Sequence, residues 1–231
     1  PESLVAHAEA IGAKLLMVQR DFDFSSLENI QWNYRFHPQS SDGQSRNRNS
    51  LPFPALRGAY QLSNAACALT VLECLNEQLP VDIGAIKRGL LLVENPGRFQ
   101  VLPGRPLVVL DVGHNPHAAC ALRRSLINLA FAQKRTAVFS MLSDKDIDGV
   151  LEIVKDQFDE WNIAPLDVPR GMTVEALQAK LAEHGIDNVN VFETVVAAYR
   201  AALAKATEND RIVVFGSFHT VADVMAVLKE H

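Results

Sequence analysis

The residues best suited to chemistry lie in one short stretch, Asp111-Val112-Gly113-His114-Asn115-Pro116. The apolar run 106–110 precedes it, and such a run between turn residues is typical of a strand buried on both faces. Residues 118–129 follow with apolar side chains at helical spacing, and the Asn-Pro pair suits the cap and first turn of that helix. In open α/β sheets ligands bind beyond such strand ends. We therefore expect a site where Asp111 accepts hydrogen bonds from a ribose and free helix N–H groups face an anion.

The same stretch also has a purely structural interpretation. In it, Asp111 holds backbone N–H groups of a capped turn and contacts no ligand. These few residues do not decide between the two interpretations.

The composition narrows the classes of partner. A chain of 231 residues with 48% hydrophobic residues can bury a sizeable core in one or two domains. The net charge is −5 and no Lys/Arg-rich block occurs, which argues against a nucleic-acid or membrane-surface partner. No run of about 18 apolar residues and no signal peptide is recognisable. We expect a cytoplasmic protein.

Three cysteines, Cys67, Cys74 and Cys120, match no zinc-binding spacing. The first two would lie roughly 10 Å apart along one helix, which is too far for a disulfide. We expect all three to be reduced core residues. Phe131 and Trp161 are likewise expected in the core.

Residues 1–97 and 98–231 are expected to form two domains. In the first, the pattern predicts helices at 1–11, 65–78 and 81–93, strands at 14–18 and 31–36, a loop at 21–24 and an exposed turn at 39–49. In the second, strands and helices alternate: strands at 107–111, 136–142, 161–168, 189–192 and 211–215, and helices at 116–130, 147–157, 173–183, 194–205 and 219–229. This alternation is typical of an α/β fold with a doubly wound, mostly parallel, Rossmann-like sheet and right-handed crossovers.

Several motifs together, in this order, resemble the folylpolyglutamate synthases, and in particular the bacterial bifunctional dihydrofolate synthase/folylpolyglutamate synthases, which are related to the muramyl-peptide ligases. The motifs are Gly58-x-x-Gln61-x-x-Asn64-Ala65-Ala66, Pro96-Gly97-Arg98-Phe99-Gln100, Asp111-x-x-His114-Asn115-Pro116, Asp144-Lys145-Asp146 and Phe215-Gly216-Ser217. The resemblance implies that 1–97 is the C-terminal part of a central α/β ATPase domain. It implies that 98–231 is a complete Rossmann-like glutamate-ligase domain.

The resemblance also implies an activity. Members of this family are ATP-dependent amide ligases that use Mg²⁺ and add L-glutamate to dihydropteroate and to folyl (poly)glutamates through an acyl phosphate, in folate biosynthesis. Positioning and charge stabilisation do most of this chemistry. We expect small-molecule substrates and a monomer.

Four residues match nucleotide-binding positions of the family. Asn64 matches the residue at the adenine, Arg98 an arginine that reaches ATP, Asp111 the ribose-binding aspartate, and His114 a histidine close to the nucleotide and to the chemistry. Each also has a structural alternative: Asn64 as a helix cap, Arg98 in an ion pair between domains, and His114 in a hydrogen bond at the helix entry. Adenosine would lie in a cleft between Asp111 and the helix opened by Asn64.

The glutamate end of the site has four candidates. Lys145 matches a family cation near the incoming glutamate or the phosphates and is the second expected catalytic residue, although it could be a solvated lysine between two aspartates. Ser217 and His219 follow the last strand, and Arg170 follows another strand at the same sheet edge.

One departure from the family is as informative as the match. The family carries a G-x-x-G-K-[ST] phosphate loop, and this sequence contains no Gly-Lys dipeptide. The resemblance therefore implies that the phosphate loop and the Mg²⁺ ligands belong to a preceding segment, so no metal site is expected here and the chain alone is predicted to be inactive. Open alternatives are a non-catalytic nucleotide-binding α/β module and another muramyl-ligase-type amide ligase. A dinucleotide-dependent enzyme is disfavoured because the first strand-to-helix turn lacks G-x-G-x-x-G.

Overall fold

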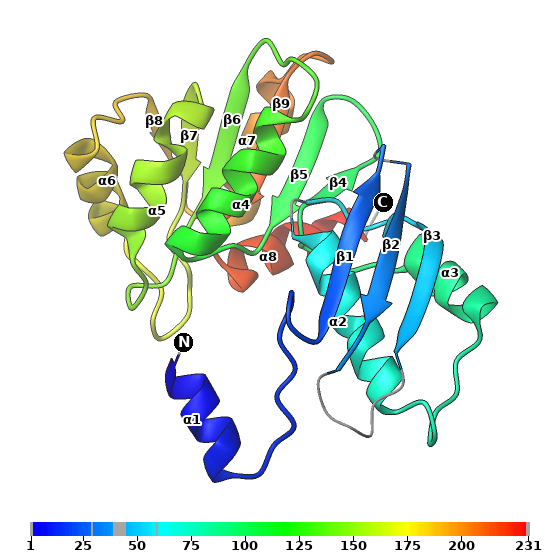
Figure 1. Ribbon diagram of the computed structural model, residues 1–231. Helices are drawn as coiled ribbons and strands as arrows, with labels where there is room; N and C mark the ends of the chain where they lie inside the picture. The colour runs from blue at the N-terminus through cyan, green and yellow to red at the C-terminus, as the bar shows by residue number, and fades with distance from the viewer. Residues whose placement is uncertain (1, 29, 39–44, 59, 230–231) are drawn as a thin grey trace. The chain divides into compact units, whose positions relative to one another are not determined.

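The computed structural model describes residues 2–28, 30–38, 45–58 and 60–229 (Figure 1). Contacts between residues divide the chain into two compact units. The first contains residues 1–55 and 60–93, and the second contains residues 56–59 and 94–231. Each unit is described by itself.

The first unit combines a small antiparallel sheet with helices. Its elements are α1 (Glu2–Ala10), β1 (Phe22–Leu27), β2 (Gln31–Phe36), β3 (Arg46–Pro52), α2 (Gln61–Cys74) and α3 (Ile83–Leu92), and the strand order is β1-β2-β3. Alternation along β2 buries Trp32, Tyr34 and Phe36 on one side of the sheet. They pack with buried side chains of α2 and α3 into one core.

Polar groups fasten α2 to this sheet. The side chain of Glu73 on α2 is 1% exposed and forms ion pairs with Arg48 at 2.6 Å and Arg46 at 3.2 Å, both on β3. The hydroxyl of Tyr34 lies 2.8 Å from that of Thr70, and burial raises the pKa of Tyr34 to about 12. Since an unpaired buried carboxylate would be costly, these arginines fix the register of α2 on β3.

The structure corrects several expectations for the first unit. Residues 14–18 form no strand beyond an isolated bridge from Val18 to Phe22, because the carboxylate of Asp21 accepts a hydrogen bond from the Met17 N–H and turns the chain. Most of the expected loop 21–24 lies in β1. In the expected turn 39–49, residues 39–44 lie outside the described residues and the segment from Arg46 onward belongs to β3.

The cysteines are free, but the prediction of a core position was wrong. Cys67 and Cys74 are exposed, and Cys120 is partly buried. The buried face of α2 instead carries Ala66, Leu69, Thr70 and Glu73, which places the cysteines beside it.

The second unit is built on a six-stranded sheet of order β4-β5-β9-β6-β7-β8. The strands are β4 (Gln100–Leu102), β5 (Leu107–Asp111), β6 (Arg135–Phe139), β7 (Glu160–Ile163), β8 (Val189–Val191) and β9 (Arg211–Phe215), and only β4 is antiparallel to its neighbour. The helices are α4 (Pro116–Ile127), α5 (Ile147–Val154) with the short 3-10 helix Lys155–Gln157, α6 (Val174–Glu183), α7 (Val195–Lys205) and α8 (Phe218–Leu228).

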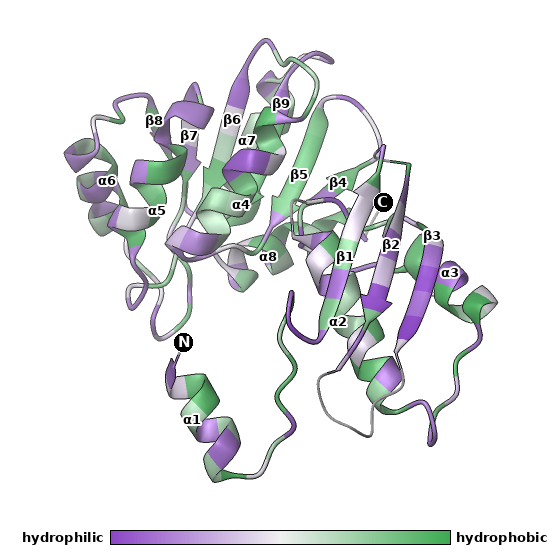
Figure 2. Cartoon of the chain, in the orientation of Figure 1, coloured by the Kyte–Doolittle hydropathy of each residue, from purple (hydrophilic) through white to green (hydrophobic). Residues whose placement is uncertain are grey.

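Helices cover both faces of this sheet, so the predicted doubly wound, mostly parallel fold is confirmed. Side chains of α4, α5 and α6 pack with Val109, Val213 and Phe215 on one face. Side chains of α7 and α8 pack with Leu110 and Val214 on the other. Consecutive residues of β5 and β9 thus enter different cores, which is why β5 is hydrophobic up to its last residue, Asp111, whereas β3 in the first unit is mainly hydrophilic (Figure 2).

Each α-helix described in this unit begins with a side-chain cap. The capping residues are Asn115, Asp146, Thr173, Thr194 and Ser217, and each side chain accepts a backbone N–H of the helix that it opens. The predicted cap Asn115 and the first-turn residue Pro116 are therefore confirmed. These turns follow the carboxyl ends of parallel strands, so the caps also shape the edge where ligands bind in such folds.

Some boundaries in the second unit differ from the prediction. The strand expected at 136–142 ends at Phe139, and the one expected at 161–168 ends at Ile163. The edge strand β4 was not predicted, because a run of three residues carries too little periodicity. Phe131 is 91% exposed rather than buried, whereas Trp161 lies in the core as expected.

Gly216 sets the position of the turn that follows β9, and its replacement should be costly. Its φ is +109°, and a Cβ there would lie 2.4 Å from the backbone oxygen of Ser140. We expect Gly216→Ala to lower the free energy of unfolding by roughly 3 kcal/mol, measured by urea denaturation. Gly185→Ala is the matched control, because Gly185 also has positive φ (+71°) but nothing lies within 4 Å of its Cβ position. The control should lose only about 1 kcal/mol, and equal losses would contradict the steric argument.

Candidate functional site

The topology predicts a ligand-binding crevice at the carboxyl ends of β5 and β9. These strands are neighbours and pair in parallel, with Asp111 opposite Phe215. The helix after β5 packs on one face of the sheet and the helix after β9 packs on the other. Such a point, where successive connections leave in opposite directions, is where open α/β sheets bind ligands.

Asp111 ends β5 and is tied to the backbone on both sides. Its Oδ2 accepts the Phe99 N–H at 2.9 Å and its Oδ1 accepts the Gly113 N–H at 2.7 Å. The structural role considered for Asp111 is thus present, and each oxygen keeps a further lone pair for a ligand hydroxyl. Burial raises the pKa of the Asp111 carboxyl, and the two N–H groups and the Arg98 charge oppose that rise.

Arg98 lies in a tight turn held against the end of β5. Gly97 precedes it with φ +72°, and the Gly97 carbonyl accepts the Val112 N–H at 2.8 Å. The Arg98 guanidinium carbon lies 5.3 Å from the ring centroid of Phe218, which is cation–π geometry. In the described part of this unit, the guanidinium contacts this aromatic ring and forms no ion pair with a carboxylate. An arginine that forms no ion pair keeps its hydrogen-bond donors for an anionic ligand.

His114 is oriented by the backbone. Its Nδ1 lies 2.9 Å from the Val112 carbonyl oxygen. A carbonyl only accepts, so Nδ1 carries the proton of this hydrogen bond, and Nε2 is left for another partner. The hydrogen bond at the helix entry that was considered for His114 is therefore present, and it leaves one nitrogen for other partners.

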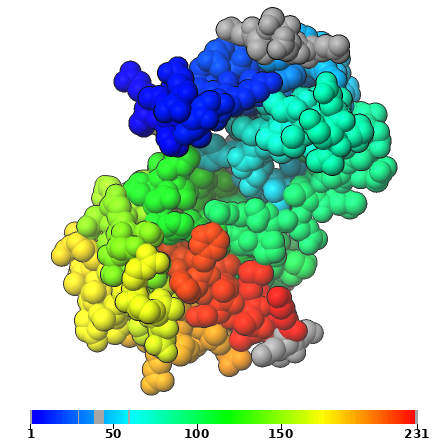
Figure 3. All heavy atoms as spheres, turned by 90° about the horizontal axis from the view of Figure 1, so that it is seen from below, coloured from blue at the N-terminus to red at the C-terminus, as the bar shows by residue number. Residues whose placement is uncertain are grey.

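Phe218, the first residue of α8, was not singled out from the sequence. Its ring is 53% exposed and lies 5.9 Å from the His114 ring, centroid to centroid. On the face of this unit in Figure 3, orange-red atoms from the start of α8 lie beside green atoms of the segment that contains β5 and α4. The available signal was an aromatic residue directly after Gly216-Ser217 at a strand-to-helix turn.

Lys145 and Arg170 come from the loops after β6 and β7 and meet at one carboxylate. Asp144 lies 2.6 Å from Arg170 and 3.4 Å from Lys145, and all three side chains are at least 30% exposed. Although desolvation acts to raise it, the pKa of Asp144 is held below its ordinary value by Lys145 and Arg170. Two cations thus share the Asp144 carboxylate, while the neighbouring Asp146 is bonded to the Gly149 N–H as the cap of α5, so the N–H donors of Lys145 and Arg170 are suited to a further anionic group.

Ser217 and His219 differ in accessibility. Ser217 is 2% exposed, and its hydroxyl accepts the His219 N–H at 3.1 Å as the cap of α8. His219 is exposed. The capping hydrogen bond accounts for a buried hydroxyl at Ser217 without any ligand. The His219 side chain is accessible to a ligand.

Asn64 belongs to the first unit. It lies inside α2, is exposed, and donates a hydrogen bond from Nδ2 to Gln61 Oε1 at 3.2 Å. The helix begins at Gln61 and no side chain caps it, so the alternative of Asn64 as a helix cap was wrong. An adenosine position between Asn64 and Asp111 stays a prediction.

The structure thus brings Arg98 and His114 to the Phe218 ring and places Asp111 where the Arg98 charge acts on it, and separately brings Lys145 and Arg170 together on Asp144. Among the described residues, no group of His, Cys, Asp or Glu side chains is arranged to hold a metal ion. Within the same residues, no helix is long and apolar enough to span a membrane.

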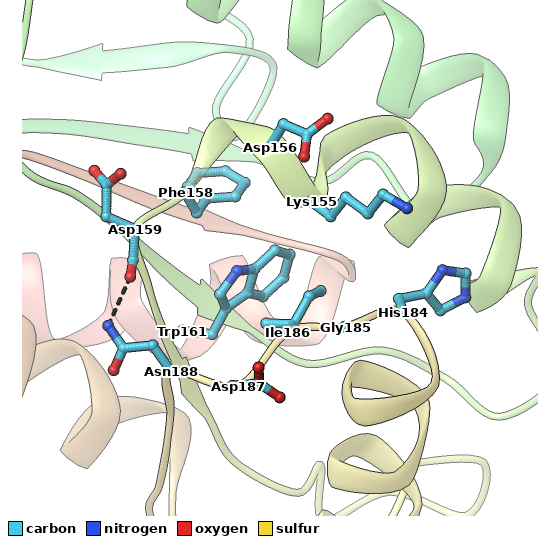
Figure 4. A pocket seen from close by; sticks show the side chains of 10 residues that line it. All are labelled: Lys155, Asp156, Phe158, Asp159, Trp161, His184, Gly185, Ile186, Asp187 and Asn188. Atoms are coloured by element: carbon cyan, nitrogen blue, oxygen red, sulfur yellow. Dashed lines mark hydrogen bonds between the residues drawn. The ribbon is translucent and has the colours of Figure 1, made fainter.

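Two hollows lie away from these residues. One, of about 250 Å³, lies beside the start of β7 and has a polar lining (Figure 4): Lys155, Asp156, Phe158, Asp159, Trp161, His184, Gly185, Ile186, Asp187 and Asn188. It is at the opposite strand end from Asp111, and the Asn188 amide closes one side by donating to the Asp159 carbonyl at 2.6 Å. The other, of about 460 Å³ in the first unit, is mainly apolar and includes Cys67 and Cys74.

Comparisons with known proteins agree with the motifs. The family described as Mur ligase, glutamate ligase domain, matches residues 97–218. A dihydrofolate synthase/folylpolyglutamate synthase of Escherichia coli (strain K12) is 39% identical over 201 residues, which cover 86% of this chain and 45% of that protein. The chain thus spans about half the length of this relative, and the expected resemblance is confirmed.

Solved structures are similar over the whole chain. E. coli FolC in complex with DHPP and ADP has a TM-score of 0.83 and 36% identity, covering 100% of this chain and 51% of that one. A bifunctional folylpolyglutamate synthase/dihydrofolate synthase with Mn, AMPPNP and L-glutamate bound has a TM-score of 0.80 and 40% identity, covering 99% and 51%.

The Asp111 carboxylate should affect stability in a pH-dependent manner. In Asp111→Asn, an amide N–H would face one of the two backbone N–H groups, and we expect a loss of roughly 1–3 kcal/mol. Because the Asp111 pKa is raised in the folded state, ionisation of this carboxyl lowers the free energy of unfolding. The excess stability of the wild type over Asp111→Asn should therefore shrink as pH rises through that pKa. Urea denaturation from pH 3 to pH 7 measures this.

Asp144→Asn is the control, because the stability that it removes should depend on pH in the opposite direction. Its pKa is lowered in the folded state, so the contribution of Asp144 should appear as pH rises and disappear in acid. The same pH trend in both variants would contradict the assigned environments.

Proposed function

We propose a function from one premise: the chain belongs to the Mur ligase family, whose glutamate ligase domain matches residues 97–218. The function is that of an ATP-dependent amide ligase that adds L-glutamate to dihydropteroate and to folyl (poly)glutamates. The observation that carries it is the convergence of Arg98, Asp111 and His114 at the crevice beyond β5 and β9. The ligands of the similar structures, ADP, AMPPNP, L-glutamate and DHPP, support the same substrate classes.

The reaction balances in two steps. A carboxylate oxygen of the pteroate or folate attacks the γ-phosphorus of ATP, and ADP leaves. The glutamate amine then attacks the resulting acyl carbon, phosphate leaves, and the nitrogen loses a proton. No side chain needs to act as a nucleophile, so the protein contributes mainly orientation and charge.

Each candidate residue has a place in this scheme. Asp111 would accept a ribose hydroxyl, Asn64 would contact the adenine, and Arg98 would contact the phosphates. His114 would present Nε2 to the nucleotide, because its Nδ1 is already bonded to the Val112 carbonyl. We place these residues at the nucleotide end of the site.

The cation pair would serve the glutamate end. Lys145 and Arg170 form a positive pair that would bind glutamate carboxylates, with Lys145 also near the transferred phosphoryl group. Ser217 and His219 are weaker candidates for the same end, because the Ser217 hydroxyl already caps α8.

The described residues do not fit a Mg²⁺ site, since no cluster of suitable ligands is present among them. The proposed reaction would use Mg²⁺ held by other residues, where it would screen the charges of the ATP phosphates. We assign residues 1–97 to the C-terminal part of an ATPase domain and 98–231 to the glutamate-ligase domain. We also propose that the protein acts in the cytoplasm as a monomer with small-molecule substrates and without nucleic-acid or membrane partners.

A non-catalytic nucleotide-binding module is the second candidate function. The observation that favours it is the sequence itself, which contains no Gly-Lys dipeptide and therefore no phosphate loop of the family type. The same observation predicts that these 231 residues alone have no ligase activity.

A chimera tests both functions. The chain is joined to the part of the E. coli relative that the match leaves uncovered, and ATP-dependent incorporation of labelled glutamate is measured with dihydropteroate and with a folyl monoglutamate. We expect ligation by the chimera and none by the isolated chain. Nucleotide binding without ligation by the chimera would favour the binding module, and ligation by the isolated chain would overturn the predicted dependence on a missing loop.

Lys145→Ala in the chimera tests the glutamate end. Loss of a charged hydrogen bond to substrate should lower kcat/KM for glutamate roughly 10- to 100-fold. Lys155→Ala is the matched control, because Lys155 pairs with Glu152 and lies in the hollow at the opposite strand end. Equal effects of the two substitutions would remove Lys145 from the site.

A further inference from the structure

We propose that Phe218 is a positioning residue that holds the Arg98 guanidinium at the crevice through its aromatic face. The inference rests on the proposed nucleotide site and adds to it a residue from a different segment of the chain. The Arg98 guanidinium carbon lies 5.3 Å from the Phe218 ring centroid. A cation over an aromatic face is attracted by the negative charge density of the ring.

The backbone of Arg98 is held in place by hydrogen bonds of the two neighbouring residues. The residue before it, Gly97, accepts the Val112 N–H, and the residue after it, Phe99, donates its N–H to Asp111. A Cβ on Gly97 would lie 2.8 Å from a methyl group of Val112, so the turn is packed closely against the end of β5. Only the long side chain of Arg98 remains free to choose among rotamers.

The ring of Phe218 is fixed by the start of α8. Ser217 caps the helix, and Val221, one turn later, is buried in the sheet core. The ring itself is 53% exposed, although the residues of β9 just before it are fully buried. A single half-exposed aromatic residue is ordinary in itself, so the contacts of the ring, and not its exposure, indicate its role.

Two functional side chains converge on this one ring. Arg98 lies over it, and the His114 ring is tilted 50° to it at 5.9 Å. Arg98 forms no ion pair in the described part of the unit, although its charge acts on Asp111 at longer range, so the ring is the close contact that limits where the guanidinium points. Without the aromatic face, the guanidinium would sample many rotamers and meet an anionic ligand less often in the right orientation.

The first test needs no ligand. NMR spectra of the chain labelled with ¹⁵N-arginine report the Arg98 Nε–H resonance, which the ring current of Phe218 should displace. We expect Phe218→Leu to move this resonance toward the position of exposed arginines and Phe218→Tyr to retain it. Phe131→Leu, a control at a ring that is 91% exposed, should leave it unchanged. An unchanged Arg98 resonance in Phe218→Leu would overturn the inference.

The second test measures consequences for binding in a double-mutant cycle. ADP affinity of the chain is measured by NMR titration for Phe218→Leu, Phe218→Tyr and the wild type, each with Arg98 and with Arg98→Met. Loss of the aromatic face should weaken ADP binding roughly two- to fivefold when Arg98 is present and have little effect in Arg98→Met. Phe218→Tyr should bind as the wild type does.

The outcomes separate this inference from the proposed function. If Arg98→Met weakens ADP binding but Phe218→Leu has the same effect in both backgrounds, Phe218 acts independently of Arg98 and the inference fails. If Arg98→Met leaves ADP affinity unchanged, the proposed nucleotide role of Arg98 fails instead. If ADP binds no variant measurably, the Arg98 resonance alone decides the positioning role.

Discussion

The arrangement of the site depends on the carboxylate at the end of β5. Asp111 accepts one N–H from the turn that contains Arg98 and another from the turn that leads into α4. One side chain thereby fixes two turns at the end of β5, the one that leads into β4 and the one that leads into α4. Because carboxylate oxygens accept strongly and in defined directions, this junction holds Arg98 and His114 at the same sheet edge.

A side chain that holds the backbone in this way can still bind a ligand. Both oxygens of Asp111 retain acceptor capacity after the backbone bonds are made. The same holds for His114, whose Nδ1 is committed to a carbonyl while Nε2 is not. Residues anchored in this way need little reordering when a ligand arrives, which lowers the entropic cost of binding.

Positive charge at this edge is supplied in two ways. Arg98 stands against an aromatic ring, whereas Lys145 and Arg170 share Asp144. The first arrangement keeps a whole charge available, and the second attenuates two charges with one carboxylate. The loops that carry the second pair are joined through their backbones, since the Ser143 N–H donates to the Arg170 carbonyl at 2.8 Å. Both arrangements suit anionic ligands.

Much of this protein was determined by local sequence. Apolar strands alternating with amphipathic helices indicated the doubly wound sheet, and Asn115-Pro116 indicated the start of α4, because these signals depend on near neighbours. The spacing of Asp111 and His114 likewise placed both at a strand end. Only the tertiary structure showed that Asp111 bonds Phe99, that Arg98 meets Phe218, and that Arg170 meets Asp144. Asp111 and Phe99 meet across the paired strands β4 and β5, and Asp144 and Arg170 meet at the ends of the neighbouring strands β6 and β7. Arg98 and Phe218 are far apart in sequence and become neighbours because β9 inserts between β5 and β6, a pairing set by long-range packing that no local pattern encodes.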